Sequence, residues 1–317
     1  MGLFKFLSAV ITRLLFILVA LIGVYRVTWV KKDDNYWFLT LVFLPLVAEM
    51  IISLKWRQGK DYKWFSPPIF LFLISIIPSI WILELHHQQY STDLECSTPD
   101  SLDSLKKLIL PNNTSENQTV NDYLKQLFST VCSNDWILAL HQIVLILLIL
   151  GRWILPLGGG VTRDELSQLL LMFVGTAADI LEFNSETLSD IRGQDNMGYI
   201  YTVLAVWTWS MLQFPLHLAV VNSAGENDGD EDIQEDSLLT KRSTDIWSIV
   251  QALFIQDGPF LAVRLIIMIK FEVFHQMRVF FAVKNFLVVI LNLYRLAVIC
   301  QESGSSIHDP VSVNVFP

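Results

Sequence analysis

Charged side chains are scarce in this sequence: only 17% of its 317 residues are Asp, Glu, Lys or Arg. Hydrophobic residues make up 53% of the chain, and a soluble domain of this size could not cover so much apolar surface. The composition therefore predicts a protein embedded in a lipid bilayer. It leaves no room for a large domain outside the membrane.

Catalytic signatures are also lacking. The sequence has no His-Glu-x-x-His zinc helix, no Gly-x-Ser-x-Gly turn, and one well-placed intramembrane Asp where an aspartyl protease needs two. The glycine run 158–160 is not followed by the Lys-Ser or Lys-Thr pair of a phosphate-binding loop. We therefore expect a protein that is not an enzyme and that has no cofactor and no metal site.

Cysteine is rare, and positive charge is in the minority. Of the three cysteines, Cys96 and Cys132 flank one long polar loop, and a disulfide between them is compatible with a luminal loop. Much of the acidic charge behind the formal net charge of −9 lies in segment 222–245, which we interpret as a solvated cytosolic loop. The charge balance disfavours nucleic acid as a partner.

Long apolar stretches, by contrast, fill the chain. An α-helix needs about 20 apolar residues to cross a bilayer. The predicted spans are residues 4–28, 36–54, 67–84, 136–155, 166–183, 199–221, 246–271 and 280–299. We therefore expect an all-α fold, a polytopic integral membrane bundle of about eight transmembrane helices that forms a single membrane domain, residues 1–317.

The stretch from Leu166 to Phe183 decides the number of spans. Its polar positions, among them Asp179 and Glu182, fall on one narrow stripe of a helix. If this helix lay on the membrane surface, the chain would have seven spans and a luminal C-terminus. The wide apolar arc and the missing Lys/Arg pattern of a surface helix favour a span, with both carboxylates near its luminal end.

The long polar loop, residues 86–135, sets the orientation. It carries N-glycosylation acceptors at Asn112, Asn113 and Asn117, and this modification is luminal. A luminal loop places the basic segment 55–63 and the N-terminus in the cytosol, in keeping with the excess of Lys and Arg on cytosolic loops. We expect a short cytosolic tail, residues 301–317, and a protein of the secretory pathway; the plasma membrane is favoured, but the sequence leaves the final membrane open.

Several polar groups fall inside the predicted spans, where a lone charge costs at least ~2.5 kcal/mol. They are Arg13, Glu49, His141, Asp179, Asp257, Arg264 and Lys284. Gly258 and Pro259 interrupt the span 246–271, and we expect a broken helix with its hinge at these two residues. A helix that restarts at Pro259 would place its positive N-terminus beside the Asp257 carboxylate.

The intramembrane cluster of Asp257, Arg264 and Lys284 has two interpretations. Discontinuous helices hold ions or polar solutes in transporters. Alternatively, Asp257 caps a kinked helix and pairs with Lys284 or Arg264 only to orient packing, as buried ion pairs often do. We favour the structural interpretation, more strongly still for Arg13 and Glu49. His141 is interpreted as a satisfied histidine of the bundle rather than a proton relay.

Five segments resemble the transmembrane protein 26 family. They run from Tyr62 to Pro67, from Gly151 to Phe183, from Trp207 to Pro215, from Phe254 to Phe260 and from Lys284 to Val289. The resemblance extends over nearly the whole chain, whereas the acidic loop at 222–236 and a short C-terminal tail depart from the family pattern. It implies a multi-pass membrane protein without an established biochemical activity.

Two hypotheses from different functional classes follow. The first is a non-enzymatic membrane scaffold or receptor-like interaction protein, whose partners are the lipid bilayer and membrane or cytosolic proteins that the sequence does not identify. The second is an ion or small-solute channel or transporter that uses Asp257, Arg264 and Lys284. The oligomeric state stays open in both.

Overall fold

The computed structural model describes residues 3–56, 62, 65–89, 133–155, 163–191, 197–216, 246–272 and 274–306. Asn112, Asn113, Asn117, Cys96 and Cys132 lie outside these residues, as do the acidic loop 222–245 and the tail beyond residue 306. Within the described ranges the chain is helical, apart from an isolated bridge between Phe65 and Leu216. The predicted all-α fold is confirmed.

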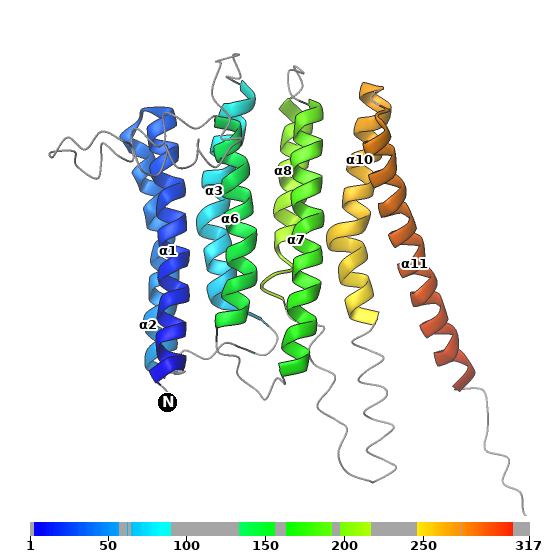
Figure 1. Cartoon of the computed structure of the whole chain (residues 1–317), viewed down its shortest axis with the longest axis horizontal. Coiled ribbons are helices and arrows are strands. Elements are labelled where there is room, and N and C mark those ends of the chain that lie inside the picture. The colour runs from blue at the N-terminus through cyan, green and yellow to red at the C-terminus, as the bar shows by residue number, and fades with distance from the viewer. Residues whose placement is uncertain are drawn as a thin grey trace, which may run out of the picture.

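The helices alternate in direction along a flat bundle (Figure 1). Their bounds are α1 Leu3–Lys31, the 3-10 helix η1 Asp34–Phe43, α2 Leu44–Trp56, α3 Pro67–Gln89, α6 Ser133–Ile154, α7 Arg163–Ile191, α8 Met197–Met211, the π-helical turn η3 Leu253–Asp257, α10 Gly258–Phe271 and α11 Gln276–Ser306. Residues 246–252 are also α-helical and lead directly into η3. Helix α3 extends beyond the predicted loop boundary at residue 86, and α11 extends beyond the predicted tail boundary at 301.

Contacts between neighbouring helices connect the whole described bundle. Helix α1 contacts α2, α3 and α6; α6 contacts α7; α3 and α7 both contact α8; and α10 connects α7 and α8 to α11. In Figure 1 the N-terminus lies at one end of the bundle, and the end of α3 and the start of α6 lie at the other. The end of α8, the start of α7 and the end of α11 share the N-terminal end.

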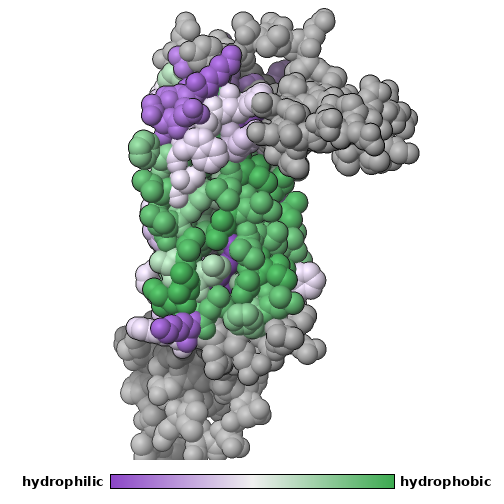
Figure 2. Space-filling view, turned by 90° about the vertical axis from the view of Figure 1, so that its left-hand side faces the viewer, coloured by the Kyte–Doolittle hydropathy of each residue, from purple (hydrophilic) through white to green (hydrophobic). Residues whose placement is uncertain are grey.

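Seven of the described helical segments are long and apolar enough to cross a membrane. They include Leu166–Ser189, which agrees with its interpretation as a span rather than a surface helix. The expected span 199–221 corresponds to α8, which has only 15 residues before the chain enters a turn. The face formed by α1 and α2 carries a belt of hydrophobic side chains with hydrophilic residues above and below it (Figure 2).

Proline placement explains several helix boundaries. Pro67 opens α3, where its missing N–H has no intrahelical partner to lose, and Pro45 lies where the 3-10 helix η1 changes to α2. Pro215 follows α8 in a tight turn of i to i+3 hydrogen bonds, and its carbonyl accepts the Ser66 N–H at 2.8 Å. This contact attaches the end of α8 to the start of α3.

We predicted a broken helix with its hinge at Gly258 and Pro259. This prediction is wrong, because the chain stays helical through both residues. Asp257 and Gly258 have helical backbone angles, and the Gly258 N–H donates to the carbonyl of Leu253 five residues earlier. The side chain of Asp257 makes no capping hydrogen bond. A π-helical turn directly before Pro259 replaces the hinge, at the point where the proline ring would crowd a regular α-helix.

Gly258 leaves room for this π turn. A Cβ atom at position 258 would lie 2.6 Å from the Leu253 carbonyl oxygen, whereas a Cβ at Gly175 of α7 would meet no atom within 4 Å. We predict that Gly258→Ala lowers the free energy of unfolding by about 1–3 kcal/mol, as overpacking does. Thermal unfolding in detergent measures the effect, with Gly175→Ala as the matched control, and equal melting of the two variants would contradict it.

Candidate functional site

Among the charged groups buried in the described part of the bundle, one centre joins α1 to α2. Arg13 of α1 donates from Nε and Nη2 to the two carboxylate oxygens of Glu49, both at 2.9 Å. Its guanidinium also donates to Ser53 Oγ at 3.0 Å and to the Ala9 carbonyl at 3.2 Å. Arg13 is fully buried. This two-point ion pair with additional hydrogen bonds has the form of a structural clamp.

The second centre is a network of two acids and two bases on three helices. Asp179 and Glu182 come from α7, Arg264 from α10 and Lys284 from α11. Glu182 accepts from Arg264 Nη2 at 2.6 Å through Oε1 and from Lys284 Nζ at 3.3 Å through Oε2. Lys284 Nζ also donates to Asp179 Oδ1 at 2.6 Å. Glu182 is therefore the bridge between α10 and α11.

Aromatic rings line the cationic side of this charge network. The Arg264 guanidinium lies 5.8 Å from the ring centre of Phe183 and 5.3 Å from that of Phe281. Lys284 Nζ lies 5.6 Å from the Phe281 ring, so one ring serves both cations. Phe183 in turn stacks on Phe260 of α10 with ring centres 4.0 Å apart. Cation–π contacts are strongest where water is excluded, and they fix both cations close to their carboxylates.

Amide side chains extend the charge network toward α8. Gln256 of the π turn donates to Asp179 Oδ2 at 3.3 Å, and its carbonyl oxygen accepts from Gln213 at 2.9 Å. Asp257, the next residue, points to a different helix and accepts from Asn292 of α11 at 3.2 Å. Trp209 donates to the Phe254 carbonyl at 3.1 Å. The π turn is thus held from both sides by side-chain hydrogen bonds.

The sequence identified most members of this centre but paired them incorrectly. Neither Arg264 nor Lys284 forms an ion pair with Asp257; in the described chain both bind Glu182 instead. The sequence signal for this arrangement was the polar stripe of α7, which carries Asp179 and Glu182 three residues apart. Helix α7 continues to Ile191, so these carboxylates lie deeper than a span ending at Phe183 would place them.

The charge network is only partly closed. The side chains of Arg264 and Glu182 are 8% and 21% exposed, but those of Lys284 and Asp179 are 30% and 40% exposed. No Cα atom of α7 lies within 8 Å of one of α11, so side chains alone bridge these helices. Lys284 and Asp179 therefore form a partly exposed polar surface between α7 and α11, which we call the α7–α11 groove.

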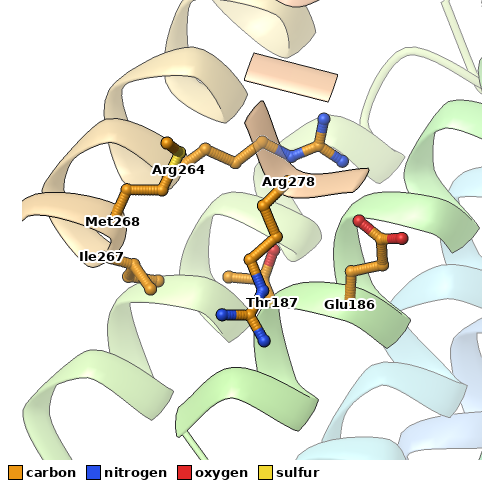
Figure 3. A pocket seen from close by; sticks show the side chains of 6 residues that line it. All are labelled: Glu186, Thr187, Arg264, Ile267, Met268 and Arg278. Atoms are coloured by element: carbon orange, nitrogen blue, oxygen red, sulfur yellow. The ribbon is translucent and has the colours of Figure 1, made fainter. Parts of the chain in front are cut away.

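A small recess adjoins this network at Arg264 and extends toward the end of the bundle opposite the N-terminus. Arg264 of α10, Arg278 of α11, and Glu186 and Thr187 of α7 surround it (Figure 3). In Figure 3 the two arginine side chains extend in different directions rather than toward one common point. The recess therefore looks like the end of the groove and not like a separate anion site.

Comparison with known protein families shows which family this chain belongs to. The model of the transmembrane protein 26 family matches residues 3–295. The chain belongs to the transmembrane protein 26 family. No solved structure matches it, so the arrangement of charges in this family member rests on its own geometry.

His141 lies apart from both charge centres of this transmembrane protein 26 family member. Its ring is 2% exposed, Nδ1 lies 2.9 Å from the Ile137 carbonyl, and Trp207 packs edge-on with ring centres 5.0 Å apart. His141 lies in the bundle interior as expected, but only Nδ1 is satisfied, because Nε2 is buried without a hydrogen-bond partner in the described residues. In the described residues no three His, Cys, Asp or Glu side chains gather as a metal ion would require.

Of the four charged residues in this network, Glu182 should be the one whose substitution destabilises the protein most. Glu182→Gln removes the carboxylate that both cations share and leaves the buried Arg264 without its ion pair. We predict a loss of about 3–5 kcal/mol in the free energy of unfolding, the cost of leaving one partner of a buried pair uncompensated. The readout is the melting temperature and the monodisperse yield in detergent.

Two controls separate charge from packing in this experiment. Asp179→Asn should cost less, because Asp179 is more exposed and Lys284 keeps Glu182 as a partner. The double variant Glu182→Gln, Arg264→Gln removes both charges and should recover part of the stability. A Glu182→Gln protein as stable as wild type would refute the bridging role.

Proposed function

We propose that this protein is a non-enzymatic membrane interaction protein of the scaffold or receptor-like kind. The α7–α11 groove is the surface that another membrane-embedded segment contacts. One observation carries the proposal: a charge-balanced network inside a predicted span is left 30–40% exposed at Lys284 and Asp179.

Lipid is a poor cover for such a groove. Hydrocarbon offers no hydrogen-bond partner to a carboxylate or an ammonium group, so exposed intramembrane charges face protein or water. Only 6% of the most apolar stretch of α11 is buried within the chain, against 56% for α3. Helix α11 therefore has most of its surface available for a second transmembrane segment that would complete the polar contacts.

The mutual pairing of the charges also supports an interaction role. Two acids and two bases neutralise one another, and each cation has a carboxylate oxygen within 2.6 Å. A network of this kind holds α7, α10 and α11 in a defined relation, which a docking surface requires. The proposal includes a cytosolic N-terminus and a plasma-membrane location, supported by the glycosylation motifs and by the placement of the α3 and α6 ends opposite the N-terminus (Figure 1).

A second candidate is a pathway for an ion or a small solute. Its support is a continuous series of hydrogen bonds that runs from Gln213 through Gln256, Asp179, Lys284 and Glu182 to Arg264. Polar chains of this kind relay protons or ions in transporters. The tight ion pairs argue against it, because a conducting site must also release its ion.

Site-specific photo-crosslinking in native membranes tests the interaction role. A photoreactive amino acid at Leu291 or Tyr294, exposed positions of α11, should give a discrete protein adduct. The double variant Asp179→Asn, Lys284→Met keeps the network neutral and should reduce this adduct roughly tenfold, the equivalent of one lost charged contact. The same probe at Phe38, which is 71% exposed on η1, is the positional control.

Ion and solute flux through purified protein in liposomes distinguishes the two candidates. The interaction role predicts no flux above empty liposomes, both for wild type and for Asp257→Asn of equal monodispersity. Flux that Asp257→Asn alters, together with adducts to lipid alone at Leu291 and Tyr294, would replace the proposal with a transport function.

A further inference from the structure

A second cavity lies apart from the arginine recess, at the N-terminal end of the bundle. It opens between α7, the turn after α8 and the helix that precedes η3. Its polar lining consists of Thr176, Gln213, Ser248, Gln251 and Gln256. The cleft has a cavity volume of about 100 Å³ and is partly open to the surroundings, so it accommodates the head group of a ligand rather than a whole molecule. We call it the glutamine cleft.

None of the described residues that line the glutamine cleft is charged. Amide and hydroxyl groups both donate and accept hydrogen bonds, so the lining suits an uncharged polar group rather than a phosphate or a carboxylate. Leu169, Met172, Phe173, Leu216 and Ala252 form the apolar remainder of the wall. A ligand that fits this wall combines a small neutral head with a hydrocarbon body.

Two polar groups of the cleft are not used by the protein itself. Gln213 and Gln256 bind each other, and Gln256 also donates to Asp179. The Thr176 hydroxyl and the Gln251 amide, by contrast, make no side-chain hydrogen bond within the described part of the chain. They come from two helices and leave donors and acceptors for a bound molecule.

The depth of the cleft suits a molecule that resides in the membrane. Ser248 lies two residues inside the predicted span that starts at Ile246, and Gln256 lies ten residues inside it. At 1.5 Å per residue the lining extends from roughly 3 Å to roughly 15 Å below the end of that span. Lipid hydroxyl groups reside near the upper part of this range and their hydrocarbon bodies lie below it.

We propose that the glutamine cleft binds an uncharged, hydroxyl-bearing membrane amphiphile, of the sterol or diacylglycerol class. The hydroxyl group is held by Thr176 and Gln251, and the hydrocarbon lies against Met172, Phe173 and Leu216. Gln256 forms the inner wall and donates to Asp179, so the ligand lies one hydrogen bond from the charge network. This inference goes beyond the interaction role and stands without it.

Photoaffinity labelling tests the proposal on the purified full-length chain in lipid nanodiscs. Three probes are used: a diazirine-bearing sterol, a diazirine-bearing diacylglycerol and, as the charged comparison, a diazirine-bearing phosphatidylserine. One of the two neutral probes should label peptides of the cleft, mapped by mass spectrometry, and excess unlabelled ligand of the same class should remove the label. The labelled class identifies the source of the hydroxyl group.

A matched pair of variants tests occupancy. Ala252 lines the cleft, whereas Ala262 is exposed on α10 and lines neither cavity. Ala252→Phe should fill the cleft and lower labelling roughly tenfold or more, while Ala262→Phe should leave it unchanged. The double variant Thr176→Val, Gln251→Leu removes only the hydrogen bonds and should lower labelling roughly threefold to tenfold for each bond lost.

Three outcomes would overturn the proposal. The first is the absence of cleft peptides among the labelled peptides of wild type with either neutral probe. The second is equal labelling of wild type and of a monodisperse Ala252→Phe protein. The third is stronger labelling of the cleft by the phosphatidylserine probe than by both neutral probes. Mapping on wild type decides the matter even if Ala252→Phe does not fold.

Discussion

A bilayer supplies no hydrogen bonds, and Glu182 is the residue on which this constraint acts most strongly. It accepts from Arg264 of α10 and from Lys284 of α11, and the backbone of α11 does not approach that of α7. Removing its charge would leave Arg264 without a carboxylate partner in a medium that cannot solvate it, whereas Lys284 would keep Asp179. Glu182 is therefore the one acceptor that α10 and α11 share, whereas Arg13 donates to Glu49, Ser53 and a backbone carbonyl.

Hydropathy was enough to predict the helices, and most intramembrane charges could be located from it. It could not assign their partners. Asp257 and Arg264 are seven residues apart on one helix and seemed a natural pair, but the π turn rotates Asp257 toward Asn292. Periodicity in a sequence assumes a constant twist, and a π turn adds one residue to it. The same turn explains why Gly258 and Pro259 read as a break, although the backbone there stays helical.

The two charge centres differ in how completely protein groups surround their charges. Arg13 is saturated and fully buried, so its centre has nothing left for a partner. The network around Glu182 is closed toward α10 and open toward the groove, where exposure rises from 8% at Arg264 to 40% at Asp179. An ion network that served only to stabilise the fold would not benefit from this rise in exposure. A partly exposed ion pair in lipid is neither solvated by water nor enclosed by protein. The gradient is what an unfilled contact surface in a membrane would show.

Gln256 connects the groove to the glutamine cleft. The π turn gives consecutive residues different directions, so that Gln256 faces α7 and α8 while Asp257 faces α11. The Gln256 amide therefore contacts both sites. Its carbonyl oxygen accepts from Gln213 at the cleft, and its N–H donates to Asp179 at the groove. A molecule that competes for Gln256 must weaken the hydrogen bond to Asp179, and one that leaves Gln256 in place must strengthen it by excluding water. In either case occupancy of the cleft would change the environment of Lys284, so the proposed ligand site and the proposed interaction surface are physically connected through Gln256.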